Sequence, residues 1–134
     1  MVEFKSLTAI VPFYNEEAYI EESLSRLINV DLFSEIILVN NNSSDNSVRI
    51  VSKYLLDYSH ITLIHAVEKE GKGYAVLEGI KQTTSTHVIV HDADLEYSPV
   101  DIEEMLEIAK MHPNDLILGS RIKGNKVRKN IYFY

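Results

Sequence analysis

Hydrophobic positions along the chain alternate between short continuous runs and longer stretches in which apolar residues recur at helical spacing. The runs are rich in β-branched and leucine side chains and occupy residues 7–11, 36–39, 61–64, 87–90 and 116–118. Such runs are typical of strands covered on both faces of a sheet. The intervening stretches predict helices with these apolar stripes: Ile20, Leu24, Leu27 and Ile28; Val48, Val51, Leu55 and Tyr58; residues 74–80; and Ile102, Met105, Leu106 and Ala109.

Two of the predicted helices carry start signals. Asn15 precedes Glu16 and Glu17, so its amide is expected to cap a first turn whose carboxylates complement the helix dipole. Ser98 and Pro99 supply a cap and a first-turn proline to the last helix. The order βαβαβαβαβ with right-handed crossovers predicts an α/β fold, a mostly parallel sheet with helices on both faces. Ligands of such folds bind outside the carboxyl ends of the strands.

Composition limits the classes of protein to which the chain belongs. It has 134 residues, of which 46% are hydrophobic, and this fits one folded domain and excludes a disordered chain. The absence of cysteine excludes disulfides, zinc–cysteine sites and thiol catalysis, and fits a reducing compartment. No apolar run approaches the ~20 residues that cross a bilayer, and residues 1–6 lack the basic start of a signal peptide. The sequence therefore predicts a cytoplasmic protein.

The charge is unevenly distributed along the chain. Of the net charge of −7, residues 1–114 contribute −11 and residues 115–134 contribute +4. An acidic body argues against a nucleic-acid partner, whose footprint is a broad positive face. The pattern divides the chain into an α/β domain over residues 1–120 and a basic, aromatic C-terminal segment over residues 121–134. For that segment, contact with a membrane surface and the solvated start of a further helix are both open.

Polar side chains follow the predicted strands, and those after the fourth strand carry the most chemistry. Asp92, Asp94 and Glu96 alternate there, so in an extended segment their side chains share one side. Hard oxygen ligands of this kind suit Mg²⁺ or Mn²⁺, which would bridge a diphosphate. An acid-rich loop entering a helix is the simpler alternative. A calcium EF-hand is excluded, because Tyr97 stands at its glycine position and a strand precedes the loop.

Three other strand ends or loops have more than one interpretation. Residues 71–73 are Gly-Lys-Gly and precede a predicted helix. Their backbone N–H groups and the Lys72 ammonium would bind a phosphate. Alternatively, the three residues simply form a turn and the start of the helix. They match neither a Walker A loop nor a Rossmann fingerprint. Residues 40–45 predict an Asx turn in which Ser44 or Asp45 caps the next helix. His91 would be a ligand, an acid or base, or a structural residue ending a buried strand.

Five motifs follow one another along the chain: Ile10-Val11-Pro12-Phe13-Tyr14-Asn15-Glu16; residues 35–45; Gly71-Lys72-Gly73 with Ala75 and Gly79; Asp92-Ala93-Asp94-Leu95; and Gly119-Ser120-Arg121. Taken in order, these motifs resemble those of the family-two glycosyltransferases, which have the GT-A fold. The last two of the matching motifs are most similar to the polyprenyl-phosphate branch, which is dolichol-phosphate mannose synthase-like. The resemblance implies a Rossmann-like GT-A domain that binds a nucleotide-diphosphate sugar with Mg²⁺ or Mn²⁺ and transfers the sugar, with inversion, to a polyprenyl phosphate or saccharide acceptor.

The roles implied by the resemblance divide according to the part of the substrate. The substrate-binding positions are Pro12, Tyr14 and Glu16 for the nucleoside, Asn40 and Asn41 for the base and ribose, and Lys72 and Asp92 for the diphosphate. The metal ligands are Asp92, Asp94 and Glu96. The catalytic residues are Asp92, Asp94 and Arg121, of which Arg121 would face the acceptor phosphate or the leaving group.

The sequence departs from the family pattern in two ways. Residues 40–42 are three asparagines where the family usually has Asp-Asp-Gly, which favours a uridine or thymidine nucleotide, because an amide oxygen still accepts a bond from uracil N3–H. Asparagine tolerates left-handed backbone geometry, so the turn at Asn42 is expected to persist. The chain also ends before the acceptor half of the family, so truncation after the donor-binding half is expected. A polyprenyl phosphate is already anionic and needs no catalytic base.

Alternatives from other classes make distinct predictions. A non-catalytic or truncated nucleotide-sugar-binding module would bind a donor but need a partner for activity. A sugar-nucleotide pyrophosphorylase is disfavoured, because residues 12–17 contain no glycine, and a receiver-type signalling domain would need an acidic pair after the first strand. With a polyprenyl acceptor, the cytoplasmic domain would lie peripherally at the membrane, in contact through residues 121–134.

Overall fold

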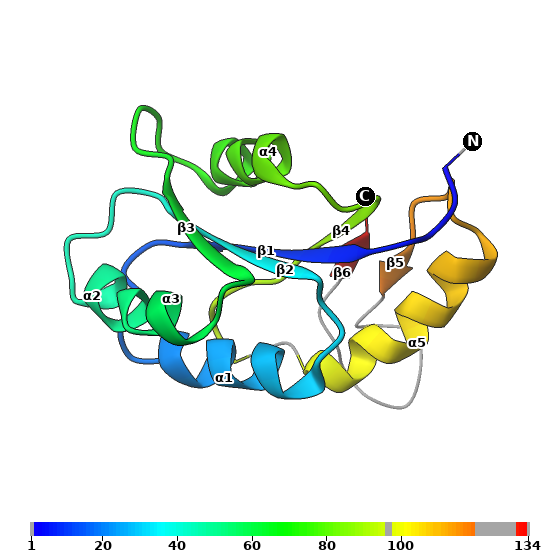
Figure 1. Ribbon diagram of the computed structural model, residues 1–134. Helices are drawn as coiled ribbons and strands as arrows, with labels where there is room; N and C mark the ends of the chain where they lie inside the picture. Colours follow the sequence, from blue (N-terminus) through cyan, green and yellow to red (C-terminus); the bar gives the residue numbers. More distant parts are fainter. Residues whose placement is uncertain (1, 96–97, 120–130, 134) are drawn as a thin grey trace.

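The computed structural model describes residues 2–95, 98–119 and 131–133. These residues form a six-stranded sheet in the order β3-β2-β1-β4-β6-β5 (Figure 1). The strands are β1 (Leu7–Phe13), β2 (Glu35–Asn40), β3 (Ile61–His65), β4 (His87–Val90), β5 (Leu118–Gly119) and β6 (Ile131–Phe133). The helices are α1 (Ile20–Val30), α2 (Ser47–Ser52), α3 (Tyr54–Asp57), α4 (Lys72–Gln82) and α5 (Pro99–Met111).

The sheet is parallel where the sequence predicted it and antiparallel at one edge. β3, β2, β1 and β4 run parallel, whereas β6 pairs antiparallel with β4 and with β5. Helix α4 covers one face, and α1, α2, α3 and α5 cover the other (Figure 1). The predicted α/β class with helices on both faces is therefore confirmed. Among the described residues, no helix combines the length and apolar character that crossing a bilayer requires.

The predicted elements differ from the observed ones in two places. The expected helix over residues 48–58 is divided at Lys53 into α2 and α3, and Tyr58 lies beyond its end with extended backbone. The expected fifth strand over residues 116–118 is replaced at the sheet edge by β5, which shares only Leu118 with it, and β6 was not predicted. These differences lie at the antiparallel edge of the sheet and in two short helices. In such short elements the hydrophobic pattern covers too few residues to determine where a helix or strand begins and ends.

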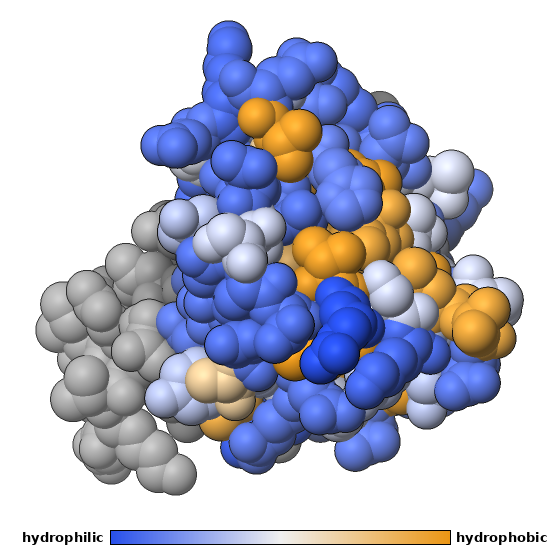
Figure 2. Space-filling view, turned by 90° about the vertical axis from the view of Figure 1, so that its left-hand side faces the viewer, coloured by the Kyte–Doolittle hydropathy of each residue, from blue (hydrophilic) through white to orange (hydrophobic). Residues whose placement is uncertain are grey.

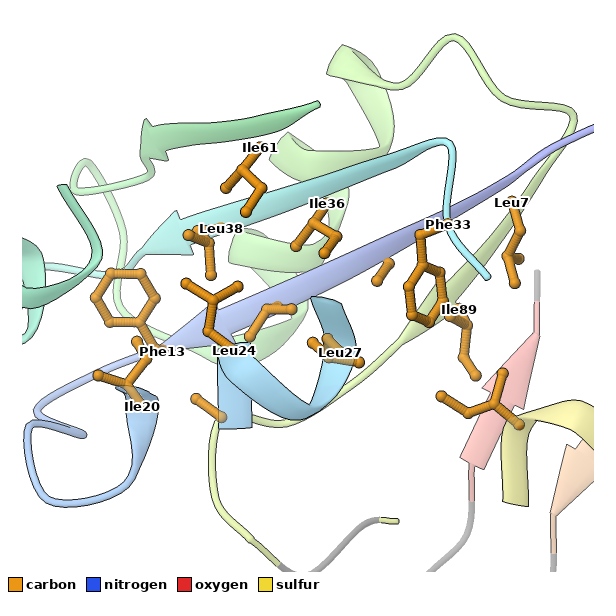
Figure 3. Close-up of a cluster of buried hydrophobic side chains, with 14 of the residues drawn as sticks. Leu7, Phe13, Ile20, Leu24, Leu27, Phe33, Ile36, Leu38, Ile61 and Ile89 are labelled. Atoms are coloured by element: carbon orange, nitrogen blue, oxygen red, sulfur yellow. The ribbon is translucent and has the colours of Figure 1, made fainter. Parts of the chain in front are cut away.

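Alternation along the strands divides the core into two layers. Leu7, Ala9, Val11 and Phe13 of β1 face one side, and Figure 3 shows how this layer packs with β2 and α1. The other side holds Ile10 of β1 with residues of β2 and α4. The first layer continues with Ile36 and Leu38 of β2 and Ile20, Leu24 and Leu27 of α1, all of them buried. Each such leucine or isoleucine contributes about 1.5–3 kcal/mol through burial.

Gly79 marks the closest approach of α4 to the sheet. A Cβ at this position would lie 2.7 Å from Cγ2 of Ile10 and 3.2 Å from Cγ2 of Val39. Both methyl groups belong to buried, β-branched side chains that have little freedom to move. Glycine at this position therefore allows α4 to pack closely against β1 and β2. The same helix begins near the carboxyl ends of these strands.

We expect Gly79→Ala to destabilise the domain, although alanine is the better helix former. Overpacking costs about 1–3 kcal/mol, and the helix propensity of alanine returns about 1 kcal/mol, so the net loss is up to about 2 kcal/mol. Gly73→Ala in the same helix is the matched control, because nothing lies within 4 Å of its Cβ position. Urea denaturation measures both variants. A Gly79→Ala domain as stable as the Gly73→Ala domain would contradict the close approach.

Candidate functional site

A cleft of about 310 Å³ opens at the carboxyl ends of β1, β2 and β4, beside the first turn of α4. Figure 2 looks onto this end of the sheet, where apolar surface gathers near the middle and hydrophilic residues surround it. The volume falls in the range of roughly 300–1,000 Å³ that holds small ligands. The residues that line the cleft are Pro12, Phe13, Tyr14, Glu16, Asn41, Lys72, Ala75, Asp92, Ala93 and Asp94.

Two loops at the rim of the cleft are joined by reciprocal hydrogen bonds. Asn15 Oδ1 accepts bonds from the backbone N–H groups of Ser44, at 2.7 Å, and Asp45, at 3.2 Å. The backbone N–H of Glu17 donates to Asp45 Oδ2 at 3.1 Å, and that of Asn46 donates to Glu17 Oε2 at 3.0 Å. The loop after β1, which carries Tyr14 and Glu16 into the cleft, is therefore held by the loop after β2.

The predicted capping role of Asn15 is wrong. α1 begins only at Ile20, and Asn15 adopts a left-handed conformation with φ 48° that turns its side chain to the neighbouring loop. The N-cap residue of α2 is Asn46, not Ser44 or Asp45 as predicted, and its side chain makes no capping bond; Asp45 Oδ1 instead accepts a bond from the N–H of Ser47, the first residue of α2. Ser98 is the N-cap residue of α5 and Pro99 follows at the first helical position, as predicted, although the serine side chain makes no capping bond.

Asn41 connects the end of β2 to the segment that leads into α4. Its Nδ2 donates to the backbone carbonyls of Ala66, at 2.6 Å, and Lys69, at 2.9 Å. Its Oδ1 accepts the N–H of Gly71 at 2.9 Å. The residue is only 8% exposed, yet it lines the cleft. Gly71 has φ 122°, a conformation that favours glycine, and Lys72 then begins the helix.

Asn40 and Asn42 occupy different surroundings. Asn40 is buried, donates from Nδ2 to Nδ1 of His65 at 3.0 Å and accepts the N–H of Ser43 at 2.9 Å. It does not belong to the residues that line the cleft. Asn42 has φ 65°, which confirms that asparagine accepts the left-handed turn expected at this position.

The residues that line the cleft include both positively and negatively charged side chains. Lys72 Nζ lies 2.5 Å from Asp92 Oδ1, and both side chains retain contact with solvent, with 54% and 22% of their surface exposed. Asp94 and Glu16 line the same cleft. Three carboxylates and one ammonium give these lining residues a net formal charge of −2. An exposed ion pair of this kind adds little to stability, so Lys72 is available to another anion.

His91 follows β4 and is a buried residue behind the acidic pair. Its side chain is 2% exposed, and its backbone N–H donates to the carbonyl of Ile10 at 2.9 Å. Burial lowers the pKa of His91 to about 4, and the backbone and charges of Asp92 and Asp94 oppose this shift only in part. The imidazole is therefore neutral at physiological pH. This favours the interpretation of His91 as a structural residue over its interpretation as a catalytic acid or base.

The structure brings together most of the predicted site residues. Within residues 2–95 and 98–119, seven of the positions assigned from the resemblance line the cleft, namely Pro12, Tyr14, Glu16, Asn41, Lys72, Asp92 and Asp94. Glu96 and Arg121 lie outside the described residues. Sequence reasoning gave no role to Phe13, Ala75 or Ala93. The spacing of Ala75 three residues after Lys72 places both on one face of α4 and would have indicated it.

The described residues supply only part of the ligand shell that a metal ion at this site would need. Among the described residues, no three His, Cys, Asp or Glu side chains are gathered closely enough to hold an ion by themselves. The cleft nevertheless offers the carboxylates of Asp92 and Asp94. Mg²⁺ is commonly bound by one or two carboxylates together with substrate phosphates and water, so the oxygen donors present fit such an ion.

Comparison with known proteins identifies the family. The sequence profile of Glycosyl transferase family 2 matches residues 8–133. The chain belongs to this family. It is 33% identical to a dolichol-phosphate mannosyltransferase of Pyrococcus furiosus over 131 residues, which cover 96% of this chain and 36% of the relative. This family 2 chain spans less than half the length of the curated relatives that it matches.

Two solved structures of similar fold contain nucleotides. The mannosyltransferase PcManGT of Pyrobaculum calidifontis, in complex with GDP-Man and Mn²⁺, superposes with a TM-score of 0.62 at 29% identity, over 68% of this chain and 28% of the other. S. aureus TarS 1–349 in complex with UDP gives 0.69 at 26% identity, over 84% and 34%. The Rossmann-like GT-A fold predicted from the sequence is confirmed.

Proposed function

We propose that this domain binds a nucleotide-diphosphate sugar with Mg²⁺ or Mn²⁺ and transfers the sugar to a polyprenyl phosphate or saccharide acceptor. The observation that carries the proposal is the cleft at the strand ends, in which an ammonium and an acidic pair from different elements meet. Family membership and the nucleotide complexes of similar structures support it. The name of the Pyrococcus furiosus relative favours the polyprenyl phosphate among the acceptors.

Each wall of the cleft has a part in donor binding under this proposal. Pro12, Tyr14 and Glu16 bind the nucleoside, and Tyr14, a residue that is 59% exposed, presents an aromatic ring large enough to stack on a base. Lys72 turns from Asp92 to the diphosphate, to which its ammonium donates charge-assisted hydrogen bonds. That Asn40 and Asn41 face the base and ribose stays a prediction, as does the preference for a uridine or thymidine nucleotide.

The reaction proposed is a single displacement with inversion. An acceptor oxygen attacks the anomeric carbon, the bond from that carbon to the diphosphate oxygen breaks, and the nucleoside diphosphate leaves with the electron pair. Asp92 and Asp94 would hold the divalent ion, which when bound offsets the charge of the departing diphosphate. Lys72 adds a second positive charge there. Arg121 is proposed to face the acceptor phosphate and Glu96 to complete the metal shell, although both lie outside the described residues.

A polyprenyl acceptor carries two further proposals. The phosphate is already an anionic nucleophile, so no residue has to remove a proton from it. Because such a lipid lies in a membrane, the cytoplasmic domain would act at the bilayer surface, with the five basic residues within 121–129 facing anionic headgroups. The alternative function is a nucleotide-sugar-binding module that binds the donor and needs a partner for activity.

A thermal-shift panel tests donor binding directly. We expect one of UDP, GDP and dTDP to raise the melting temperature by several degrees in the presence of Mn²⁺, because a ligand at 100 times its Kd stabilises the native state by about 2.7 kcal/mol. Mn²⁺ alone and inorganic pyrophosphate with Mn²⁺ are the controls. If calorimetry with Mn²⁺ detects none of the three nucleotides, the proposal is wrong. Donor binding without transfer to any polyprenyl phosphate would favour the binding module.

A further inference from the structure

The contacts of Asn41 give a physical reason for an amide side chain at this position. The two hydrogens of its amide are directed at two carbonyl oxygens, those of Ala66 and Lys69, at 2.6 and 2.9 Å. A carboxylate has no hydrogen to donate, so an aspartate here would place negative charge against both carbonyls. The amide is thus required by the loop as it is folded in this chain.

The loop held by Asn41 is the one that delivers Lys72. The segment over residues 66–71 leaves β3 and is fixed at its start by the bond from the N–H of Ala66 to the carbonyl of Asn40, at 2.9 Å. Asn41 then holds it at Ala66, Lys69 and Gly71. Lys72 follows directly as the first residue of α4, and both it and Ala75 line the cleft.

We infer that Asn41 is a positioning residue for the diphosphate part of the donor, acting through residues 66–71 on Lys72 and the first turn of α4. This inference rests on the proposed function of the same cleft. Both hydrogens of the amide and one lone pair of Oδ1 are used within the protein. What remains for a nucleobase is one lone pair on a residue that is 8% exposed. The principal effect of Asn41 is therefore on phosphate binding.

The two roles differ in the ligand that reports them. A residue that reads the base affects every ligand with that base, whether it carries one phosphate or two. A residue that positions Lys72 and α4 affects the ligands that reach this helix, which are the diphosphates. The affinities of UMP and UDP, or of the corresponding pair for the base that the wild-type domain prefers, therefore separate the roles.

Asn41→Asp is the decisive variant, because it keeps the shape and removes both donors. We expect its affinity for the nucleoside diphosphate in Mn²⁺ to fall about 10- to 100-fold, the range that follows from leaving buried partners without their hydrogen bonds. Its affinity for the monophosphate should stay within about twofold of wild type. Asn42→Asp is the matched control, since it adds the same charge at an exposed neighbour whose left-handed conformation aspartate tolerates, and both affinities should stay near wild type.

Three outcomes overturn the inference. These are equal losses for monophosphate and diphosphate, no loss for either, or an Asn42→Asp variant that loses the diphosphate as strongly. If Asn41→Asp does not fold, amide hydrogen exchange in the wild-type domain decides: the Gly71 N–H, donated to Asn41 Oδ1, should exchange slowly without ligand, and fast exchange would contradict the inference. Failure of the proposed function is recognised separately, because the wild-type domain would then bind none of the nucleotides.

Discussion

Replacing Asp92 and Asp94 together by asparagine should remove the ability of Mn²⁺ to strengthen nucleotide binding. Each carboxylate lines the cleft, and a charged partner is worth about 1.5–3 kcal/mol, so the double substitution should weaken nucleoside diphosphate binding in Mn²⁺ by about 100-fold. Without metal the effect should be small or of opposite sign, since the charge of the lining residues rises from −2 to zero and Lys72 loses the partner that competes with the diphosphate.

Calorimetric titration of the diphosphate with and without Mn²⁺ measures both effects. The control is the double substitution Asp31→Asn and Asp57→Asn, which changes the net charge equally at two exposed positions outside the cleft. Asp31 has φ 51°, and asparagine accepts this geometry. If the Asp92 and Asp94 variant keeps a wild-type response to Mn²⁺, the ion is bound elsewhere or is not used.

Acid should destabilise the domain through His91 before the carboxyl groups are fully protonated. The folded-state pKa of about 4 lies below the ordinary value of 6.5, so the unfolded chain binds the proton more strongly between these values. Stability from this group is complete above about pH 6.5, is lost as the pH falls, and is gone near pH 4. The difference between the two pKa values corresponds to about 3 kcal/mol.

Denaturation in urea as a function of pH checks this prediction. Wild type should lose stability as the pH falls through this window, and His91→Gln should lose less of it, because its buried side chain does not titrate. His60→Gln is the control, since His60 lies before β3 and outside the core. Parallel pH profiles for wild type and His91→Gln would contradict the prediction, because they would show that the folded domain binds a proton at His91 as readily as the unfolded chain does.

The parallel part of the fold follows from features that act over a few residues. Strand runs such as residues 36–39 and the stripe of α1 are continuous and strongly apolar, so burial alone determines their type. The gathering of Pro12, Lys72 and Asp92 in one cleft was predictable because the segments that follow parallel strands meet at one edge of the sheet, and the roles of these residues stay predictions. β6 and the break at Lys53 depend on contacts that a local pattern does not contain.

The roles of two asparagines needed the structure for a different reason. Asn15 has the sequence context of a helix cap, and its left-handed backbone instead turns it to the loop after β2. The resemblance implied that Asn41 faces the base or ribose, whereas in the structure its amide donates to the carbonyls of Ala66 and Lys69. In both cases the partner is a backbone group far away in the sequence. Because nearly every residue type has the same backbone N–H and C=O groups, the sequence does not indicate which distant residue will be the hydrogen-bond partner.

The strand order β3-β2-β1-β4 also links ligand binding in the cleft to the folding of the whole sheet. Its lining runs from Pro12 to Asp94, and neighbouring walls come from segments separated by long stretches of chain. The residues that line the cleft come together only when the parallel strands have paired. The domain is therefore able to bind a ligand only in the state in which the sheet is folded. A ligand that enters the cleft should therefore slow hydrogen exchange throughout the core strands, including positions such as Ile37 that it never touches.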